Sequence, residues 1–168
     1  MGGVEGPHTS SGFPCGAARD RSQPLNRMQI IRQALPTFDH ALPQTRLPVE
    51  RLTLAKRRWR GVAEDDQEFG FDLETPLTDN AAVHQSATSV YILAQKYEPV
   101  LEVALGADSP TAARLGWMIG NLHFQIEVSG PIVRVVDDPA VRQLFDREGI
   151  AYVACKRVFH PLSGGHHH

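Results

Sequence analysis

The stretch that decides the fold is residues 98–160, EPVLEVALGADSPTAARLGWMIGNLHFQIEVSGPIVRVVDDPAVRQLFDREGIAYVACKRVFH. It opens with an apolar run at residues 100–105, which is typical of a buried strand. Ser109 followed by Pro110 predicts a helix start, with serine as the N-cap and proline in the first turn. Apolar residues then recur at helical spacing, at Ala112, Leu115, Ile119 and Leu122. The stretch therefore begins as a strand followed by a helix.

The remainder of this stretch continues with two strands, a helix and a strand. Two apolar segments flank the Ser-Gly pair at 129–130, which is typical of a hairpin turn. The Asp-Pro pair at 138–139 predicts a second capped helix, which Gly149 ends. A last apolar segment, residues 150–155, completes the order β-α-β-β-α-β of the ferredoxin-like unit. We therefore predict an α+β fold with a ferredoxin-like domain at residues 98–160.

Residues 49–97 predict a small β domain that precedes this unit. Apolar and polar residues alternate at 51–54, and again in two segments, 58–63 and 68–73. The acidic residues 64–67 separate these two segments as a hairpin connection would. We expect four or five short strands here.

The two ends of the chain predict flexible segments. Residues 1–48 hold six of the twelve prolines, and a segment of this composition buries too little apolar surface to offset its ordering entropy. One short helix is expected within it, near residues 25–35, from helical spacing of apolar residues. Residues 161–168 are expected to form a flexible tail that ends in histidines.

The composition is that of a globular protein with a packed core. Of the 168 residues, 42% are apolar and 21% are charged. No apolar run reaches the length of a membrane span, and no secretory signal is expected. Two cysteines, Cys15 and Cys155, are too few for a disulfide framework and suit a reducing cytosol. We expect a cytoplasmic protein without a membrane partner.

The charge argues against a nucleic-acid binder. The formal net charge is −2, whereas a generic nucleic-acid binder carries a basic excess. Arg57, Arg58 and Arg60 flank Trp59, and we interpret this cluster as the solvated edge of a strand. No nucleic-acid partner is expected.

The usual catalytic motifs are absent. The chain has no GxxxxGK[ST], GxGxxG, HExxH, CxxC or GxSxG pattern. The sequence therefore does not predict an enzyme.

The histidines are the remaining candidates for chemistry, because imidazole nitrogen binds nickel, copper and zinc. His160 follows the last predicted strand, and His166, His167 and His168 follow Ser-Gly-Gly. A flexible tether offers ligands that bind and release, which favours transfer of a metal over its storage. The three terminal histidines are also what a purification-tag remnant would look like.

His123 is the principal candidate ligand. It lies at the end of the first predicted helix, within about 40° of the apolar stripe. Gly116 and Gly120 leave room for another backbone, and a two-fold dimer would pair His123 with its copy. The alternative is a core histidine, or one stabilised by the helix C-terminus.

These features together resemble the UreE family of urease accessory nickel metallochaperones. The resemblance runs from about residue 51 to 159 and rests on four segments, Leu52-Thr53-Leu54, Gly70-Phe71-Asp72-Leu73, Glu98-Pro99-Val100-Leu101 and Gly120-Asn121-Leu122-His123. It implies a peptide-binding-like β domain, and a homodimer in which two copies of His123 bind Ni(II). It also implies apo-urease and its accessory GTPase complex as partners. Leu122 departs from the arginine usual before the motif histidine, and Asp137 and Pro139 stand where some members have histidines.

The histidines, together with what this resemblance implies, lead us to expect a homodimeric nickel metallochaperone that delivers Ni(II) to apo-urease. The predicted ligands are His123, His160, His166, His167 and His168, with Zn(II) or Cu(II) as competing metals. The alternative is a non-metal interaction module in which the ferredoxin-like half only dimerises. A small enzyme on the same fold is a third, less supported interpretation.

Overall fold

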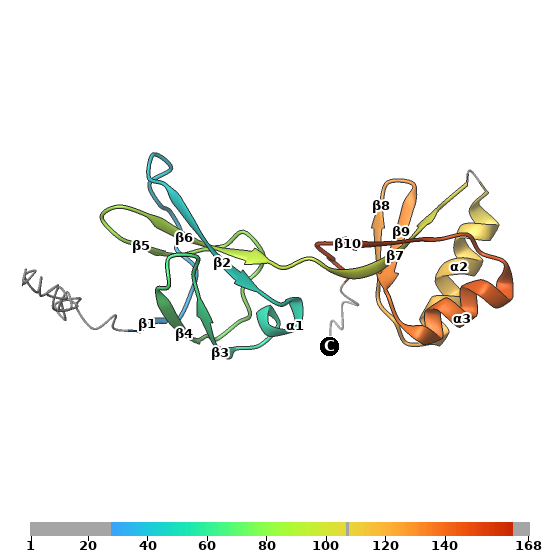
Figure 1. Cartoon of the computed structure of the whole chain (residues 1–168), viewed down its shortest axis with the longest axis horizontal. Coiled ribbons are helices and arrows are strands. Elements are labelled where there is room, and N and C mark those ends of the chain that lie inside the picture. Colours follow the sequence, from blue (N-terminus) through green and yellow to red (C-terminus); the bar gives the residue numbers. More distant parts are fainter. Residues whose placement is uncertain (1–27, 107, 163–168) are drawn as a thin grey trace, which may run out of the picture.

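The computed structural model describes residues 28–106 and 108–162 (Figure 1). The fold is mixed α+β and is built mostly of strands. The strands are β1 (Gln29–Ile31), β2 (Gln44–Val49), β3 (Arg58–Val62), β4 (Glu68–Asp72), β5 (Ala82–Gln85), β6 (Val90–Gln95), β7 (Glu98–Ala104), β8 (Ile126–Ser129), β9 (Ile132–Val136) and β10 (Val153–Arg157). The helices are α1 (Arg51–Leu54), α2 (Ser109–Asn121) and α3 (Pro139–Glu148). Among the described residues no helix is long and apolar enough to cross a membrane.

Strands β1 to β6 form two three-stranded sheets, which we call the N-terminal half. Their orders are β1-β4-β3 and β2-β6-β5, and β1 and β2 each pair with their neighbour in parallel. Leu47, Phe69 and Leu93 are fully buried between these strands. The predicted strands at 58–63 and 68–73 correspond to β3 and β4.

The prediction of a flexible segment over residues 1–48 was wrong for residues 28–48, the part that the structure describes. β1 and β2 both lie there, and they bury Ile31, Leu47 and Val49. The short helix expected near residues 25–35 is also wrong in its described part, where β1 pairs with β4. Among the described residues, Pro36 and Pro43 lie between β1 and β2, and Pro48 lies near the end of β2, where a missing N–H is tolerated. These prolines are therefore compatible with short strands. Residues 1–27 lie outside the described residues.

Residues 51–54 form helix α1 and not the predicted strand. The carbonyl of Glu50 accepts hydrogen bonds from the backbone N–H groups of Thr53 (2.9 Å) and Leu54 (3.0 Å), which closes a helical turn. Leu54 is buried, whereas Leu52 is 66% exposed. A four-residue alternation is too short to distinguish a strand from one helical turn.

Residues 98–157 form a four-stranded antiparallel sheet with two helices, which we call the C-terminal half. The elements follow in the order β7-α2-β8-β9-α3-β10, and the strands pair in the order β10-β7-β9-β8. Both helices lie on the same side of this sheet (Figure 1). Leu101 and Val135 from the sheet pack there against Ile119 of α2 and Phe145 of α3.

Three element boundaries in the C-terminal half differ from the prediction. The N-cap of α2 is Asp108, whose carboxylate accepts the Thr111 N–H at 3.3 Å, rather than Ser109. β8 begins at Ile126, although the apolar segment before the Ser-Gly pair, predicted as a strand, begins at Phe124. β10 begins at Val153, because the residues before it pack against the helices instead of pairing in the sheet. The predicted caps of α3, Asp138 and Gly149, are confirmed.

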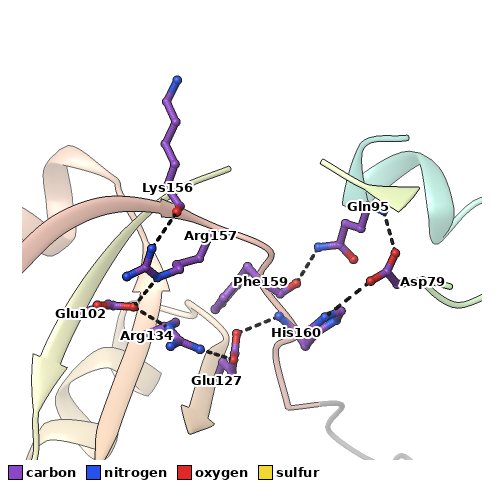
Figure 2. Close-up of polar contacts among 9 residues, drawn as sticks. All are labelled: Asp79, Gln95, Glu102, Glu127, Arg134, Lys156, Arg157, Phe159 and His160. Atoms are coloured by element: carbon purple, nitrogen blue, oxygen red, sulfur yellow. Dashed lines mark hydrogen bonds and ion pairs between the residues drawn. The ribbon is translucent and has the colours of Figure 1, made fainter. Parts of the chain in front are cut away.

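The face of this sheet that has no helices carries a ladder of four charged side chains (Figure 2). Arg134 bonds to Glu127 (2.6 Å) and Glu102 (2.8 Å), and Glu102 also bonds to Arg157 (3.0 Å). The hydrogen bond from Arg134 has the largest effect and lowers the pKa of Glu102 below its usual value. Arg157 lowers this pKa further, whereas burial raises it. The ladder therefore ties all four strands together across this face.

We predict that Arg134→Gln destabilises the chain by about 2 kcal/mol at neutral pH, because two weakly exposed carboxylates lose a charged donor. Since the pKa of folded Glu102 is lowered, this stabilisation is complete above the ordinary glutamate pKa of about 4.3 and is lost as the pH falls through the folded value. Urea unfolding at neutral and acidic pH measures both effects. Arg147→Gln, at an exposed pair on α3, is the matched control. Equal losses in the two variants would contradict the role of the ladder.

Candidate metal-binding histidines

His123 lies just beyond the C-terminus of α2, in a left-handed backbone conformation. The helix ends with hydrogen bonds from Leu122 N–H to the Ile119 carbonyl (3.1 Å) and from His123 N–H to the Gly120 carbonyl (2.9 Å). The φ angle of His123 is 62°, which side chains with a Cβ seldom adopt. Because the backbone turns here, His123 does not continue α2 and does not join its apolar stripe.

The side chain of His123 is exposed. The prediction that it lies on or beside the apolar stripe was wrong, because α2 buries Leu115 and Ile119 and ends before His123. The alternative of a core histidine does not apply either. Among the described residues its imidazole has no hydrogen-bond or ion-pair partner, so both ring nitrogens remain available to a ligand.

The surface of α2 next to His123 is open and partly apolar. A Cβ built on Gly116 or Gly120 would meet no atom within 4 Å. Trp117 is 67% exposed on the same helix, and Leu122 is exposed as well. A second polypeptide can therefore approach this part of α2 without a steric barrier.

His160 lies at the junction of the two halves (Figure 2). Its backbone N–H donates to Glu127 Oε2 at 2.9 Å, and its Nε2 is 3.9 Å from Asp79 Oδ2. The preceding residue, Phe159, is fully buried, and its carbonyl accepts a 2.8 Å hydrogen bond from the amide of Gln95. The His160 side chain is 57% exposed. The backbone at residue 160 is thus held in place while the imidazole faces solvent.

The chain leaves this junction alongside β8. Leu162 N–H donates to the Ile126 carbonyl at 2.8 Å, whereas His160 contacts Glu127. The segment therefore runs antiparallel to β8, toward the residues that connect β8 to His123. The tail histidines His166, His167 and His168 lie outside the described residues.

No group of three or more potential metal ligands exists within residues 28–106 and 108–162. Among the described residues, no hydrogen bond, ion pair or ring contact joins the side chains of His123 and His160. His40 and His84 lie in the N-terminal half against aromatic rings, at 4.3 Å from Phe38 and 5.7 Å from Tyr91 between ring centroids. The described part of one chain thus contains no cluster of ligands that would enclose a metal.

Two other positions discussed from the sequence have structural partners. The carboxylate of Asp137 bonds to Arg142 through two contacts of 2.6 and 2.7 Å, which lower the pKa of Asp137. Cys155 lies half-buried on β10, where burial raises the pKa of its thiol. Both residues are therefore less suited to metal binding than the histidines.

Sequence analysis missed the residues that hold His160 in place. In the sequence, Asp79 is followed by Asn80, a pair typical of a turn, and nothing in the pattern singles out Gln95 or Glu127. Asp79 Oδ1 accepts the Gln95 backbone N–H at 2.7 Å, so one carboxylate connects the end of β6 to His160. No sequence spacing links these residues, because the contacts that hold this segment join residues far apart in the chain, Gln95 and Phe159 at a separation of 64 residues and Glu127 and His160 at a separation of 33.

The comparisons with known proteins agree on one family. A family model described as the C-terminal domain of the UreE urease accessory protein matches residues 98–168. The urease accessory protein UreE of Nitrosococcus oceani is 27% identical over 119 residues, which cover 67% of this chain and 71% of the relative. Two Pseudomonas relatives are similar over 121 residues, namely UreE 2 of P. syringae pv. tomato (23% identical) and UreE of P. fluorescens (24%), each covering 68% of this chain and 72% of the relative.

We predict that His123→Gly leaves the free energy of unfolding within about 0.5 kcal/mol of the parent. Glycine adopts a positive φ without strain, which offsets its greater entropy in the unfolded chain. His123→Val should lose about 1 kcal/mol or more, because a β-branched residue is strained there. Urea unfolding measures both variants. A valine variant as stable as the parent would show that residue 123 is not left-handed in solution.

We also predict that Gln95→Ala destabilises the chain by about 1–3 kcal/mol, because the buried Phe159 carbonyl loses its donor. Amide hydrogen exchange at His160 and Leu162 should become faster in the same variant. Gln67→Ala is the matched control, since the Gln67 amide also donates to a backbone carbonyl, that of Glu68 at 3.0 Å, but at the surface. Unchanged exchange at residues 160 and 162 would contradict the anchoring role of Gln95.

Proposed function

Because the chain belongs to the UreE family of urease accessory proteins, which are accessory chaperones and not enzymes, we propose that it binds Ni(II) and delivers it to apo-urease. The observation that carries this proposal is the exposed imidazole of His123, without a partner among the described residues, in the segment Gly120-Asn121-Leu122-His123. Delivery requires a site with open coordination positions, whereas a closed structural site would retain its metal. A single exposed histidine meets that requirement.

We propose that the functional unit is a homodimer in which two copies of His123 hold the metal. One histidine per chain becomes a facing pair across a two-fold axis. The open surface at Gly116 and Gly120 and the exposed Trp117 support close approach of a second α2 helix. Nickel is the cargo, and Zn(II) or Cu(II) would compete for the same imidazoles.

His160 and the tail histidines His166, His167 and His168 are proposed to complete or relay the coordination. The direction of the chain at Leu162, toward the residues between β8 and His123, supports this role. Four extended residues from Leu162 to His166 span about 14 Å, whereas the three residues from Ile126 to His123 span at most about 11 Å. The tail is therefore long enough to reach the His123 of its own chain.

The family further suggests the cell compartment and the partners. We propose a cytoplasmic protein that works with apo-urease and the accessory GTPase complex, without a nucleic-acid or membrane partner. We interpret residues 98–160 as a ferredoxin-like domain, since its strands pair in the order β10-β7-β9-β8 with both helices on one side. We propose that this domain binds the metal and forms the dimer. We propose that the preceding β domain begins at residue 28 rather than at residue 49, because β1 pairs with β4 and β2 pairs with β6.

Equilibrium dialysis against Ni(II) and Zn(II) tests the metal site. We expect His123→Gly to weaken Ni(II) binding by more than the roughly 10- to 100-fold typical of losing a supporting residue. A chain that ends at Leu162 should retain the His123 site and bind fewer ions in total. His40→Ala, at an exposed histidine of the other half, is the control and should bind as the parent does.

The outcome that would contradict the proposal is Ni(II) binding by His123→Gly equal to that of the parent. If the chain that ends at Leu162 also binds as much Ni(II) as the parent, the two results together would favour the non-metal interaction module. Transfer is tested separately by mixing the nickel-loaded chain with apo-urease in the presence of a chelator and measuring urease activity. Sedimentation of the parent with and without Ni(II) tests the dimer.

A further inference from the structure

A surface of the N-terminal half, far along the chain from the proposed metal ligands, carries a groove lined by arginines. Three cavities of about 410, 380 and 880 Å³ share Arg58 in their walls. Arg32, Arg57 and Arg60 line the same cavities. We call this surface, defined by these four arginines, the arginine groove.

The floor of the groove is apolar. In the sheet β1-β4-β3, Ile30 and Arg60 both pair with Gly70, so their side chains share one face with the hollow between them. Gly70 makes this hollow possible, because a Cβ there would lie 2.8 Å from Ile30 Cδ1. Ile30 is 53% exposed, and Met28 lies beside it. An apolar strip therefore runs next to the arginines.

The arginine groove has an excess of positive charge. Arg58 forms an ion pair with Asp72 at 2.8 Å. Within the described residues, Arg32, Arg57 and Arg60 form no ion pair. Glu74 is the other acidic residue in the wall. This local excess contrasts with the net charge of −2 of the whole chain.

We propose that the arginine groove binds an extended, acidic segment of a partner protein in which apolar residues accompany the carboxylates. Guanidinium groups bind carboxylates through paired hydrogen bonds, and three of them here lack such a partner. The strip formed by Met28 and Ile30 would accept the apolar side chains. Charge complementarity of this kind raises the association rate and selects the partner.

Two other occupants fit less well. A nucleic acid binds through stacking of its bases as well as through its phosphates, and the exposed apolar residue of the groove is an isoleucine, not an aromatic ring on which bases stack. Residues 1–27 of the chain itself carry three arginines against two acidic residues, so their charge does not complement the groove. The partner segment is therefore inferred to belong to another protein.

The test is fluorescence anisotropy with a short fluorescein-labelled peptide rich in Glu and Leu. A peptide with Gln in place of Glu and a labelled oligothymidylate are the competing probes. We expect the acidic peptide to bind the full chain, and binding to weaken strongly between about 0.05 and 0.5 M salt, because screening shortens the range of exposed charges. Replacing Arg32, Arg57 and Arg60 together by Gln should weaken binding by about tenfold or more.

Two further variants separate the contributions to binding. Ile30→Gln should weaken binding of the acidic peptide by severalfold, because the variant loses an apolar side chain of the strip. Arg147→Gln, which removes an exposed arginine from α3, is the control and should leave the affinity unchanged. The Ni(II) affinity of all these variants should equal that of the parent, so failure of the groove is distinguishable from failure of the proposed function.

Three results would overturn the proposal. Equal binding of the Gln peptide would remove the role of charge. Equal or tighter binding of the oligothymidylate, lost in the triple arginine variant, would make the groove a nucleic-acid surface. Acidic-peptide binding that survives in the triple variant would place the peptide elsewhere on the chain.

Discussion

The buried hydrogen bond from Gln95 to the Phe159 carbonyl is the contact on which the placement of the C-terminal segment depends. It joins the end of β6 to the residue before His160, and only Lys96 and Tyr97 separate β6 from β7. The Arg51–Glu98 pair, at 2.7 Å, stabilises the same junction from α1. With Phe159 buried and its carbonyl bonded, the backbone of His160 cannot move freely although its side chain is exposed. The tail therefore starts from a defined point next to β8.

The left-handed turn at His123 exposes a side chain to solvent, whereas the contacts at Phe159 anchor the backbone. A histidine that continued α2 would turn toward its buried face, whereas the turn after Asn121 directs the ring to solvent. The conformation has a cost of about 1 kcal/mol for a residue with a Cβ. Glycine would avoid this cost, so the backbone conformation alone does not explain why residue 123 is a histidine. The explanation must lie in what the imidazole side chain does. An imidazole exposed at the cost of backbone strain is consistent with a ligand that must meet a second chain.

Much of the C-terminal half could be predicted from its sequence, because its helices are long enough to show their period and carry Asp-Pro or Ser-Pro starts. The N-terminal half could be predicted less well. β1 and β2 have three and six residues, and their burial depends on β4 and β6, which lie far along the chain. The alternation at residues 51–54 suggested a strand because a single helical turn shows no period. His123 could be singled out from its segment, but its exposure depends on one backbone angle that no residue pattern specifies. The contacts of His160 could not be predicted, since Asp79, Gln95 and Glu127 meet it only in the folded chain.

The two surfaces with unpaired groups lie in opposite halves of the chain (Figure 1). The arginine groove is built on β1, β3 and β4, whereas His123 follows α2 and His160 lies at the junction. A divalent cation and a set of unpaired guanidinium groups repel each other, and this repulsion falls off over about 10 Å at moderate salt. Their placement in different halves would therefore let the arginines attract an acidic partner without opposing the proposed binding of Ni(II) at His123. Because β6 and β7 connect the two halves, a partner bound at the groove would be held on the same molecule as the histidines.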